Sequence, residues 1–440
     1  MVQKNILLIL FIFIWSTLAR AGDISILFVS DVTGYKVPML DIRILYVNQG
    51  LLYEQFFCGA FTTIETQGDG WYYLLGTTPE GDKITSRFLV RDDKVPPITV
   101  RVPYMQHGLP PEFSLDSLEE GLDYGEARLA GYITDRLGNP ASCVKVEWKN
   151  GHQSVSTDKD GFFVFDIKLV NEGKKPLWYK IDIDGKKYAS LYLQSRSLAT
   201  LFGYGIERLL HEGLQQNPDL PIESLFWKPY RREQSAFSNY FPTHIALGED
   251  LPKTGKRPWE RPARITMVHV STDYTWMSAL SEFTMSNSEG YGGAGIVLVR
   301  THAFRYLTRG PKPGMPCDLS NSQYCQQYRR NGFVSIRYLK KVQRIARELE
   351  GMVILDHKGG VRFVQYANTT PRDDVSSPAT SNDKRVSQET MARLAKEHPH
   401  WDYKDILKNS SSIGGTFKYV NVYTLHDNLP LYTGKVKAKP

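Results

Sequence analysis

A single glutamate in the C-terminal half of the chain has neighbours suited to acid–base chemistry. Glu282 comes nine residues after Asp273 and eighteen residues before Arg300. Breaking a glycosidic bond requires a proton at the leaving oxygen, and a carboxylic acid delivers it best when a partly apolar pocket favours its protonated form. The apolar side chains close enough in sequence to form such a pocket are Leu280, Phe283 and Met285.

The number of carboxylates at such a site decides the reaction. A common glycoside hydrolase needs a second carboxylate about 5–10 Å from the first, and Asp273 is a candidate for it. A lytic transglycosylase needs only one, because the sugar's own 6-hydroxyl attacks while the same glutamate acts first as acid and then as base. The residues alone leave both routes open.

Six pieces of sequence occur in order around Glu282. They are Asp273-Tyr274, Ser281-Glu282-Phe283, Arg300-Thr301, Cys325-Gln326-Gln327-Tyr328, Phe363 to Tyr366, and Val386-Ser387-Gln388. In this order, residues 264 to about 422 resemble the SpoIID/LytB family of cell-wall enzymes, in which one glutamate cleaves the glycan strands of peptidoglycan. The resemblance implies a lytic transglycosylase that prefers strands without stem peptides.

The resemblance also implies a role for each matching residue. Glu282 would be the catalytic acid, and Arg300 would bind substrate oxygens or orient Glu282. The substrate-binding positions would be Asp273, His302, Tyr366, Ser387 and Gln388. Other interpretations stay open: a structural ion pair for Arg300, packing or capping for Tyr366 and Gln388, and a strand-to-helix turn fixed by Asp273.

The chain departs from the family pattern where the substrate groove is expected. Gly295 replaces a glutamine, His302 replaces a tyrosine, and Asn368-Thr369-Thr370 replaces Ser-Gly-Gly. Asp383-Lys384-Arg385 replaces a glycine-rich run. These changes favour an alternative function, a non-catalytic peptidoglycan-binding or amidase-enhancing protein that has kept the fold.

Four cysteines, Cys58, Cys143, Cys317 and Cys325, allow three disulfide pairings. In some members of the family, a cysteine pair like Cys317 and Cys325 holds zinc with two histidines. Here Tyr324 stands before the second cysteine, and no histidine lies between residues 303 and 356. We therefore expect a Cys317–Cys325 disulfide, with no metal and no cofactor.

The elements expected to position these residues form a mixed α/β unit over residues 263–423. Hydrophobic periodicity predicts a strand over 265–270 and helices over 274–280, 296–307 and 338–349, the last ended by Gly351. A hairpin is expected between 352–355 and 362–366. Ser387 and Asp402 are expected to cap two further helices, and residues 371–386 read as a polar loop.

The N-terminal half is expected to be all-β. Residues 1–21 have the pattern of a cleaved signal peptide, 22–106 of a β-sandwich, and 128–195 resemble a carboxypeptidase-regulatory-like β-sandwich. Residues 107–127 are expected to be a linker, 196–262 a connecting segment with a short helix over 206–214, and 424–440 a tail. The two β units look like copies, since Asp31 to Pro38 parallels Asp135 to Pro140. Asp158 and Asp160 fit either a calcium site or an ordinary hairpin turn.

Composition and charge agree with an exported envelope protein. The 440-residue chain carries a formal net charge of +7, which falls to +5 when Lys4 and Arg20 of the signal are removed. A mild positive charge suits an anionic envelope polymer, and no basic stripe points to nucleic acid. The expected fold is multidomain: two N-terminal all-β sandwiches followed by a SpoIID-like α+β catalytic domain. The expected location is the periplasm or cell wall, and the protein is not expected to be integral to the membrane. The expected partners are peptidoglycan glycan strands and, further, a cell-wall amidase or another envelope protein.

Overall fold

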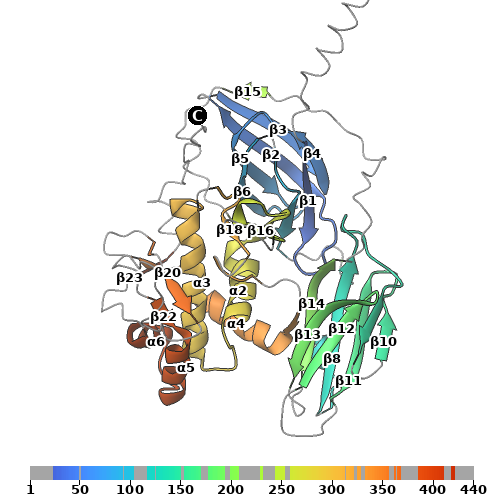
Figure 1. Cartoon of the computed structure of the whole chain (residues 1–440), viewed down its shortest axis with the longest axis vertical. Helices are drawn as coiled ribbons and strands as arrows, with labels where there is room; N and C mark the ends of the chain where they lie inside the picture. Colours follow the sequence, from blue (N-terminus) through green and yellow to red (C-terminus); the bar gives the residue numbers. More distant parts are fainter. Residues whose placement is uncertain are drawn as a thin grey trace, which may run out of the picture.

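The computed structural model describes residues 23–48, 51–92, 94–103, 116–123, 125–149, 153–169, 177–193, 199–207, 228–230, 243–252, 258–312, 314–321, 325–328, 332–355, 361–362, 364–367, 385–410 and 418–421. Over these residues the chain combines antiparallel sheets, two sheets of mixed strand direction and five α-helices. Figure 1 shows the blue strands above the yellow-to-red helices and the green strands to their right. The expected signal peptide and the C-terminal tail lie outside the described residues.

The first pair of sheets encloses an apolar core. A five-stranded sheet of order β15-β3-β2-β5-β6 faces a six-stranded sheet of order β18-β16-β17-β7-β1-β4. Ile24, Ile26 and Phe28 alternate along β1, so the two-residue period of a strand puts all three on the core face. The strands are β1 Asp23–Ser30, β2 Met39–Asn48, β3 Leu51–Gly59, β4 Phe61–Glu65, β5 Gly70–Thr77, β6 Lys83–Val90, β7 Ile98–Val102, β15 Lys228–Tyr230, β16 His244–Glu249, β17 Arg264–His269 and β18 Leu319–Ser320.

The second pair of sheets encloses its own core. Sheets of order β10-β9-β12-β13 and β11-β8-β14-β19 face each other, and Trp148 stacks on Tyr179 between them with ring centroids 4.4 Å apart. The strands are β8 Glu126–Thr134, β9 Lys145–Trp148, β10 Gln153–Ser156, β11 Phe162–Lys168, β12 Leu177–Ile183, β13 Lys186–Leu193, β14 Ala199–Glu207 and β19 Phe333–Ser335.

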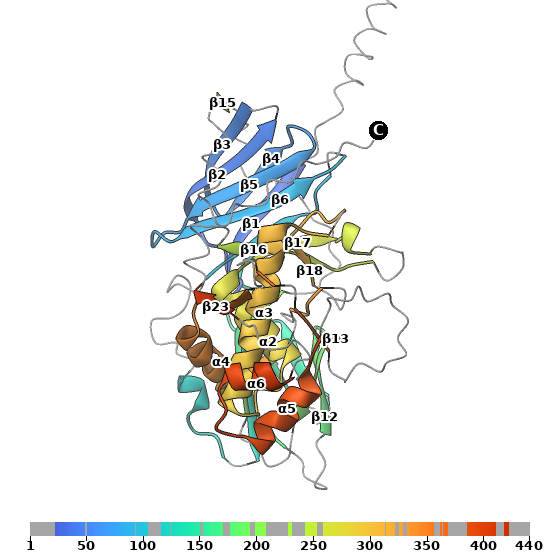
Figure 2. The ribbon, with the colours of Figure 1, turned by 90° about the vertical axis from the view of Figure 1, so that its left-hand side faces the viewer.

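The helices pack around one long central helix, α3, which Figure 2 shows running beside α2, α4 and α6. Residues 291–299 of α3, which carry no charged side chain, are all buried. The helices are α2 Thr275–Glu282, α3 Glu289–Arg309, α4 Ile336–Glu348, α5 Gln388–Glu397 and α6 Tyr403–Ser410. Short strands and turns complete the unit: β20 Met352–Leu355, β21 Gln365–Ala367, β22 Arg385–Ser387, β23 Lys418–Asn421, and the single turns η1 Ser117–Glu119, η3 Pro258–Glu260 and η4 Val270–Tyr274.

Both pairs of sheets are continuous with the helical unit. β17, which leads into the helices, pairs in parallel with β7, with Ile265 opposite Ile98 and Met267 opposite Val100. β19, which leads into α4, pairs with β14 of the second pair. Because backbone hydrogen bonds join the units at both places, the sheets position the helices directly.

Several expected elements are present with shifted ends. The strand at 264–269, the helices α2 and α4, and the stop at Gly351, whose φ is 76°, agree with the sequence pattern. Ser387 caps α5 by accepting from the N–H of Thr390 at 3.1 Å. The carboxylate of Asp402 accepts from the N–H groups of Lys404 and Asp405 at the start of α6.

Two expectations about local elements are wrong. Ile206 and Glu207 end strand β14 instead of starting a helix, because β14 pairs with β8 through most of its length; residues 208–214 lie outside the described residues. The hairpin after β20 is reduced to a bridge between Leu355 and Val361, and β20 instead pairs along its length with β23.

The expected duplication of the β units holds for one part of the topology. β1 and β8 each lie between an antiparallel and a parallel neighbour, and the parallel neighbour, β7 or β14, borders a strand of the helical unit. The two matching loops, Asp31 to Pro38 and Asp135 to Pro140, also contact each other, because the N–H of Lys36 donates to the carbonyl of Gly138 at 3.0 Å. β5, which follows Asp69, and β11, which follows Asp160-Gly161, lie in non-equivalent sheets.

Candidate functional site

Glu282 is the last residue of a short helix that begins directly after a strand. β17 ends at His269, whose ring accepts from the N–H of Thr272 at 3.3 Å and so caps the turn η4. The hydroxyl of Thr275 donates to the carbonyl of Val270 at 2.6 Å, which joins this turn to the first residue of α2. The helix α2 is eight residues long, and Glu282 is half-buried at its C-terminal end.

The short segment Cys325 to Tyr328 crosses this helix end and holds it. The backbone N–H of Gln327 donates to Oε1 of Glu282 at 2.6 Å. On one side of Gln327, the amide of Gln326 joins two tyrosines: it accepts from the hydroxyl of Tyr274 and donates to the hydroxyl of Tyr366 at 2.5 Å. The carboxylate of Glu282 therefore lies beside an ordered polar cluster.

Burial sets the charge state of this cluster. Desolvation is the main cause that raises the pKa values of Tyr274 and Tyr366, and the nearby carboxylate of Glu282 raises both further. Both phenols therefore stay protonated over the physiological range. A protonated phenol can donate a hydrogen bond, and each is paired with Gln326.

Three of the expected substrate-binding residues gather through the pairing of two short strands. β21 carries Tyr366, and it runs parallel to β22 with Tyr366 opposite Val386 and Ala367 opposite Ser387. Ser387 then caps α5, and Gln388 is its first residue. The side-chain nitrogen of Gln388 is buried and makes no hydrogen bond with the described residues. Tyr366 also contacts the ring of Phe283, with centroids 5.1 Å apart, which links this group to Glu282.

Asp273 is a structural carboxylate in the turn η4. It is 4% exposed, and both of its oxygens accept from the hydroxyl of Tyr328, at 2.9 and 3.0 Å. The guanidinium of Arg101, on β7, lies 3.9 Å from Oδ2. These contacts match the interpretation in which Asp273 fixes the strand-to-helix turn.

Arg300 and His302 lie on α3 and are both buried. Arg300 donates to the carbonyls of Leu349 and Ala346, so its guanidinium is aimed at the C-terminal end of α4 and caps that helix. The ring of His302 faces the carbonyl of Val364, and burial lowers its pKa to about 4, so it is neutral at pH 7. Arg300 thus holds α4 in place, and His302 supports the chain just before β21.

The departure at Gly295 has a counterpart at Phe283. A Cβ atom at position 295 would lie 2.8–3.0 Å from three ring carbons of Phe283, well inside van der Waals contact. The ring of Phe283 occupies the space next to the helix that a larger residue at 295 would need. The glycine at 295 and the aromatic ring at 283 are therefore packed against each other.

The expected Cys317–Cys325 disulfide is wrong, because all four cysteines are free thiols. Cys317 is fully buried in the core of the first pair of sheets, and its Sγ contacts the carbonyl of Leu319 at 3.1 Å. Cys325 instead pairs with the hydroxyl of Tyr306 on α3. Over the described residues, no three His, Cys, Asp or Glu side chains gather as metal ligands would.

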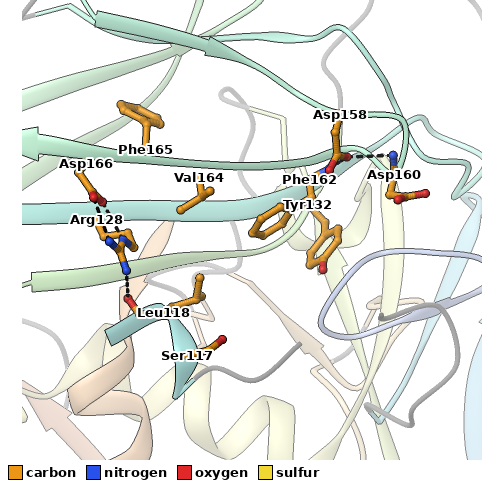
Figure 3. A pocket seen from close by; sticks show the side chains of 10 residues that line it. All are labelled: Ser117, Leu118, Arg128, Tyr132, Asp158, Asp160, Phe162, Val164, Phe165 and Asp166. Carbon is orange, nitrogen blue, oxygen red and sulfur yellow. Dashed lines mark hydrogen bonds and ion pairs between the residues drawn. The ribbon is translucent and has the colours of Figure 1, made fainter. Parts of the chain in front are cut away.

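A pocket of about 480 Å³ lies elsewhere, on the outer face of the second pair of sheets (Figure 3). Phe162, Tyr132 and Val164 lie between an Arg128–Asp166 ion pair and the turn that carries Asp158 and Asp160. Ser117 and Leu118 of η1 form the opposite wall. Every guanidinium nitrogen of Arg128 already donates a hydrogen bond, to the carboxylate of Asp166 or to the carbonyls of Leu118 and Glu120.

Residues Asp158 to Asp160 form an ordinary hairpin turn. Oδ1 of Asp158 accepts from the N–H groups of Asp160 and Phe162, both at 2.9 Å, and Gly161 has a φ of 68°. These are the local bonds that an Asx turn makes. The turn interpretation of the two aspartates accounts for these contacts.

Sequence reasoning missed the residues that connect the site. Gln326 and Tyr328 are 3% and 1% exposed and bind Tyr274, Tyr366 and Asp273. Gln326 and Tyr328 belong to the piece Cys325 to Tyr328, and Tyr274 belongs to the piece Asp273-Tyr274. The sequence pattern therefore contained these residues, although it gave them no role. What sequence could not show was their direction relative to Glu282.

No helix in the described part of the chain has both the length and the apolar character needed to cross a bilayer.

The chain has no match among family models or curated proteins. Among solved structures, the Bacillus anthracis TIE protein matches 43% of this chain and 33% of its own chain, at 10% identity and a TM-score of 0.17. A streptococcal ancillary pilin matches 42% of this chain and 68% of its own, at 11% identity and a TM-score of 0.13. At such low TM-scores neither likeness carries an argument about function.

Proposed function

We propose that this protein is an exported cell-wall enzyme that cleaves peptidoglycan glycan strands by lytic transglycosylation, with Glu282 as its single acid and base. The observation that carries the proposal is the hydrogen bond from the N–H of Gln327 to the carboxylate of Glu282, beside the paired Tyr274, Gln326 and Tyr366. Three segments distant in sequence meet there, residues 274–282, 326–327 and 366, and all three belong to the pieces that carry the SpoIID/LytB resemblance.

The contacts suit the two roles that one carboxyl must play. Glu282 in its protonated form donates to the leaving glycosidic oxygen, and the resulting carboxylate then takes the proton of the attacking 6-hydroxyl. The N–H of Gln327 orients this carboxyl group and stabilises the anion between the two steps. The phenols of Tyr274 and Tyr366 stay neutral and so do not compete for the proton.

The single-carboxylate route is favoured over hydrolysis by the position of Asp273. A second catalytic carboxylate must reach a water molecule on the far side of the sugar or the sugar carbon itself. Asp273 is buried and is bound by Tyr328 and Arg101. It therefore acts as support for the turn, and the attacking group in this proposal comes from the substrate.

The proposal includes the finer organisation of the chain. Residues 263–423 would form the SpoIID-like catalytic unit, and the two pairs of sheets would be the N-terminal sandwiches that position it. The signal at 1–21 would direct the protein to the periplasm or cell wall. Its substrate would be glycan strands, preferentially those without stem peptides, and a cell-wall amidase or another envelope protein is a further proposed partner. The catalysis proposed here uses no cofactor.

Digestion of purified peptidoglycan tests this function. The mature chain, its Glu282→Gln variant and a control, Glu289→Gln, are incubated with strands that carry or lack stem peptides, and the products are analysed by mass spectrometry. Glu289 is an exposed glutamate that pairs with Arg344, so its variant keeps the fold and the contacts of Glu282. We expect 1,6-anhydro ends from the wild type and the control, and none from Glu282→Gln. Reducing ends would refute transglycosylation, and equal products from all three would refute the role of Glu282.

A second candidate function, glycan binding or amidase enhancement without turnover, is favoured by one observation. Arg300, the expected partner of Glu282, is buried and donates to two carbonyls at the end of α4, which is a structural role and not a catalytic one. A pelleting assay with insoluble peptidoglycan separates the two. Retention of the protein without any released product would favour the binding protein.

A further inference from the structure

We propose that Arg101, on strand β7 of the first pair of sheets, is a positioning residue for Glu282. It would act through Asp273, Tyr328 and the N–H of Gln327. This inference rests on the proposed function for its effect on turnover, but its structural step can be measured independently. In this inference, the first pair of sheets contributes a residue that positions Glu282.

The first step is the continuous sheet. β7 and β17 pair in parallel from Ile98–Ile265 to Val100–Met267, so the next residue of β7, Arg101, lies beside the end of β17, where the turn η4 begins. The carbonyl of Arg101 faces the Nε2 atom of His244 at 3.0 Å, which ties β7 to β16 as well. The backbone at Arg101 is therefore held by β17 and β16 of the same six-stranded sheet.

The second step is the charge of Arg101. Its side chain is 1% exposed, and one nitrogen, Nη1, donates to the carbonyl of Asp31 at 2.8 Å. The Nε and Nη2 atoms make no hydrogen bond with the described residues. The carboxylate of Asp273, 3.9 Å away, carries the opposite charge. A buried charge without a partner is strongly unfavourable, so the two side chains hold each other in place.

The third step runs from Asp273 to Glu282. The hydroxyl of Tyr328 donates to both oxygens of Asp273, and the N–H of Tyr328 donates to the side chain of Asn321 at 2.8 Å. These bonds fix Tyr328 at both ends. The preceding residue, Gln327, supplies the N–H that binds Glu282. A shift of Asp273 is therefore passed along two adjacent peptide units to the catalytic carboxylate.

Arg87 offers a matched control. It is also 1% exposed, lies on β6 of the same pair of sheets, and crosses to the helical unit, where it binds the carboxylate of Asp318 at 3.0 Å. It also donates to the carbonyl of Leu307 at the end of α3. Loss of Arg87 therefore removes a buried ion pair from the same interface, but not the one that leads to Gln327.

Hydrogen exchange on the full chain tests the structural step. Arg101→Gln, Arg101→Lys and Arg87→Gln are compared with the wild type, and exchange is followed in peptides that cover Cys325 to Tyr328. We expect Arg101→Gln to speed exchange at the Gln327 amide by about tenfold or more, since an amide that loses its acceptor opens locally. Arg101→Lys should restore part of the protection, and Arg87→Gln should leave this amide unchanged.

Turnover is measured on the same variants. Arg101→Gln should lower kcat by up to roughly a hundredfold with little change in KM, because a small misplacement of the acid slows the chemical step. Unchanged exchange in Arg101→Gln, or equal acceleration in Arg87→Gln, would overturn the inference. If the wild type releases no glycan product, the proposed function fails, and the exchange data still decide whether Arg101 positions Glu282.

Discussion

Substitution of Gly295 by alanine probes the packing that holds the glutamate end of α2. The added Cβ would lie 2.8 Å from Cγ and 3.0 Å from each Cδ of Phe283. An aromatic ring cannot bend away as a flexible side chain can, and this ring is itself held by Tyr366 and Tyr291. The alanine must therefore displace Phe283, the residue next to Glu282.

A second glycine on the same helix serves as the reference. At Gly292, a Cβ would lie 3.2 Å from the terminal methyl of Ile345 and 3.6 Å from the sulfur of Met285, and both of these flexible side chains can adjust. Alanine in a helix is favoured over glycine by about 1 kcal/mol, and overpacking of a core costs about 1–3 kcal/mol. We therefore expect Gly292→Ala to be stabilising by up to about 1 kcal/mol. Gly295→Ala should range from neutral to about 2 kcal/mol destabilising.

Chemical denaturation followed by circular dichroism measures both variants in parallel. The double variant Gly295→Ala/Phe283→Leu should recover stability relative to Gly295→Ala alone, because the smaller side chain makes room for the methyl group. Equal free energies of unfolding for Gly292→Ala and Gly295→Ala would refute the reasoning. So would a double variant whose loss is the sum of the two single losses.

Three further predictions concern stability. Ser387→Ala removes the cap of α5 and should lower the free energy of unfolding by about 1 kcal/mol; Ser387→Asp, which can still cap, should not, and denaturation midpoints compare the two. Arg300→Met should cost roughly 1–3 kcal/mol for each carbonyl of α4 left without its donor, and an unchanged thermal midpoint would contradict the capping role. Burial lowers the pKa values of His302 and His269 to about 4. The unfolded chain therefore binds more protons below pH 6.5, and the stability that neutral His302 contributes, about 3 kcal/mol, is lost between pH 6.5 and 4. In His302→Phe the free energy of unfolding should fall less steeply between pH 6.5 and 4. An equal fall in wild type and variant would contradict this role of His302.

Sequence by itself was sufficient for the local structure around the site. The helical spacing of α2 and α4, the stop at Gly351 and the cap of α5 by Ser387 follow from interactions within a few residues of chain. The segments that meet near Glu282 were also identified in sequence, because each has its own distinct residue types. These features depend on periodicity and on short-range hydrogen bonds, which any stretch of chain carries with it.

Only the tertiary structure decided how those segments face one another. The pairing of β7 with β17 brings Arg101 to Asp273, although 172 positions separate them in the sequence. The guanidinium of Arg300 binds carbonyls at the end of α4, and Cys317 and Cys325 are free thiols. The physical reason is that strand partners and side-chain directions are chosen by the burial of distant surfaces against each other. Local patterns show which face of an element is apolar, but not which other face will cover it.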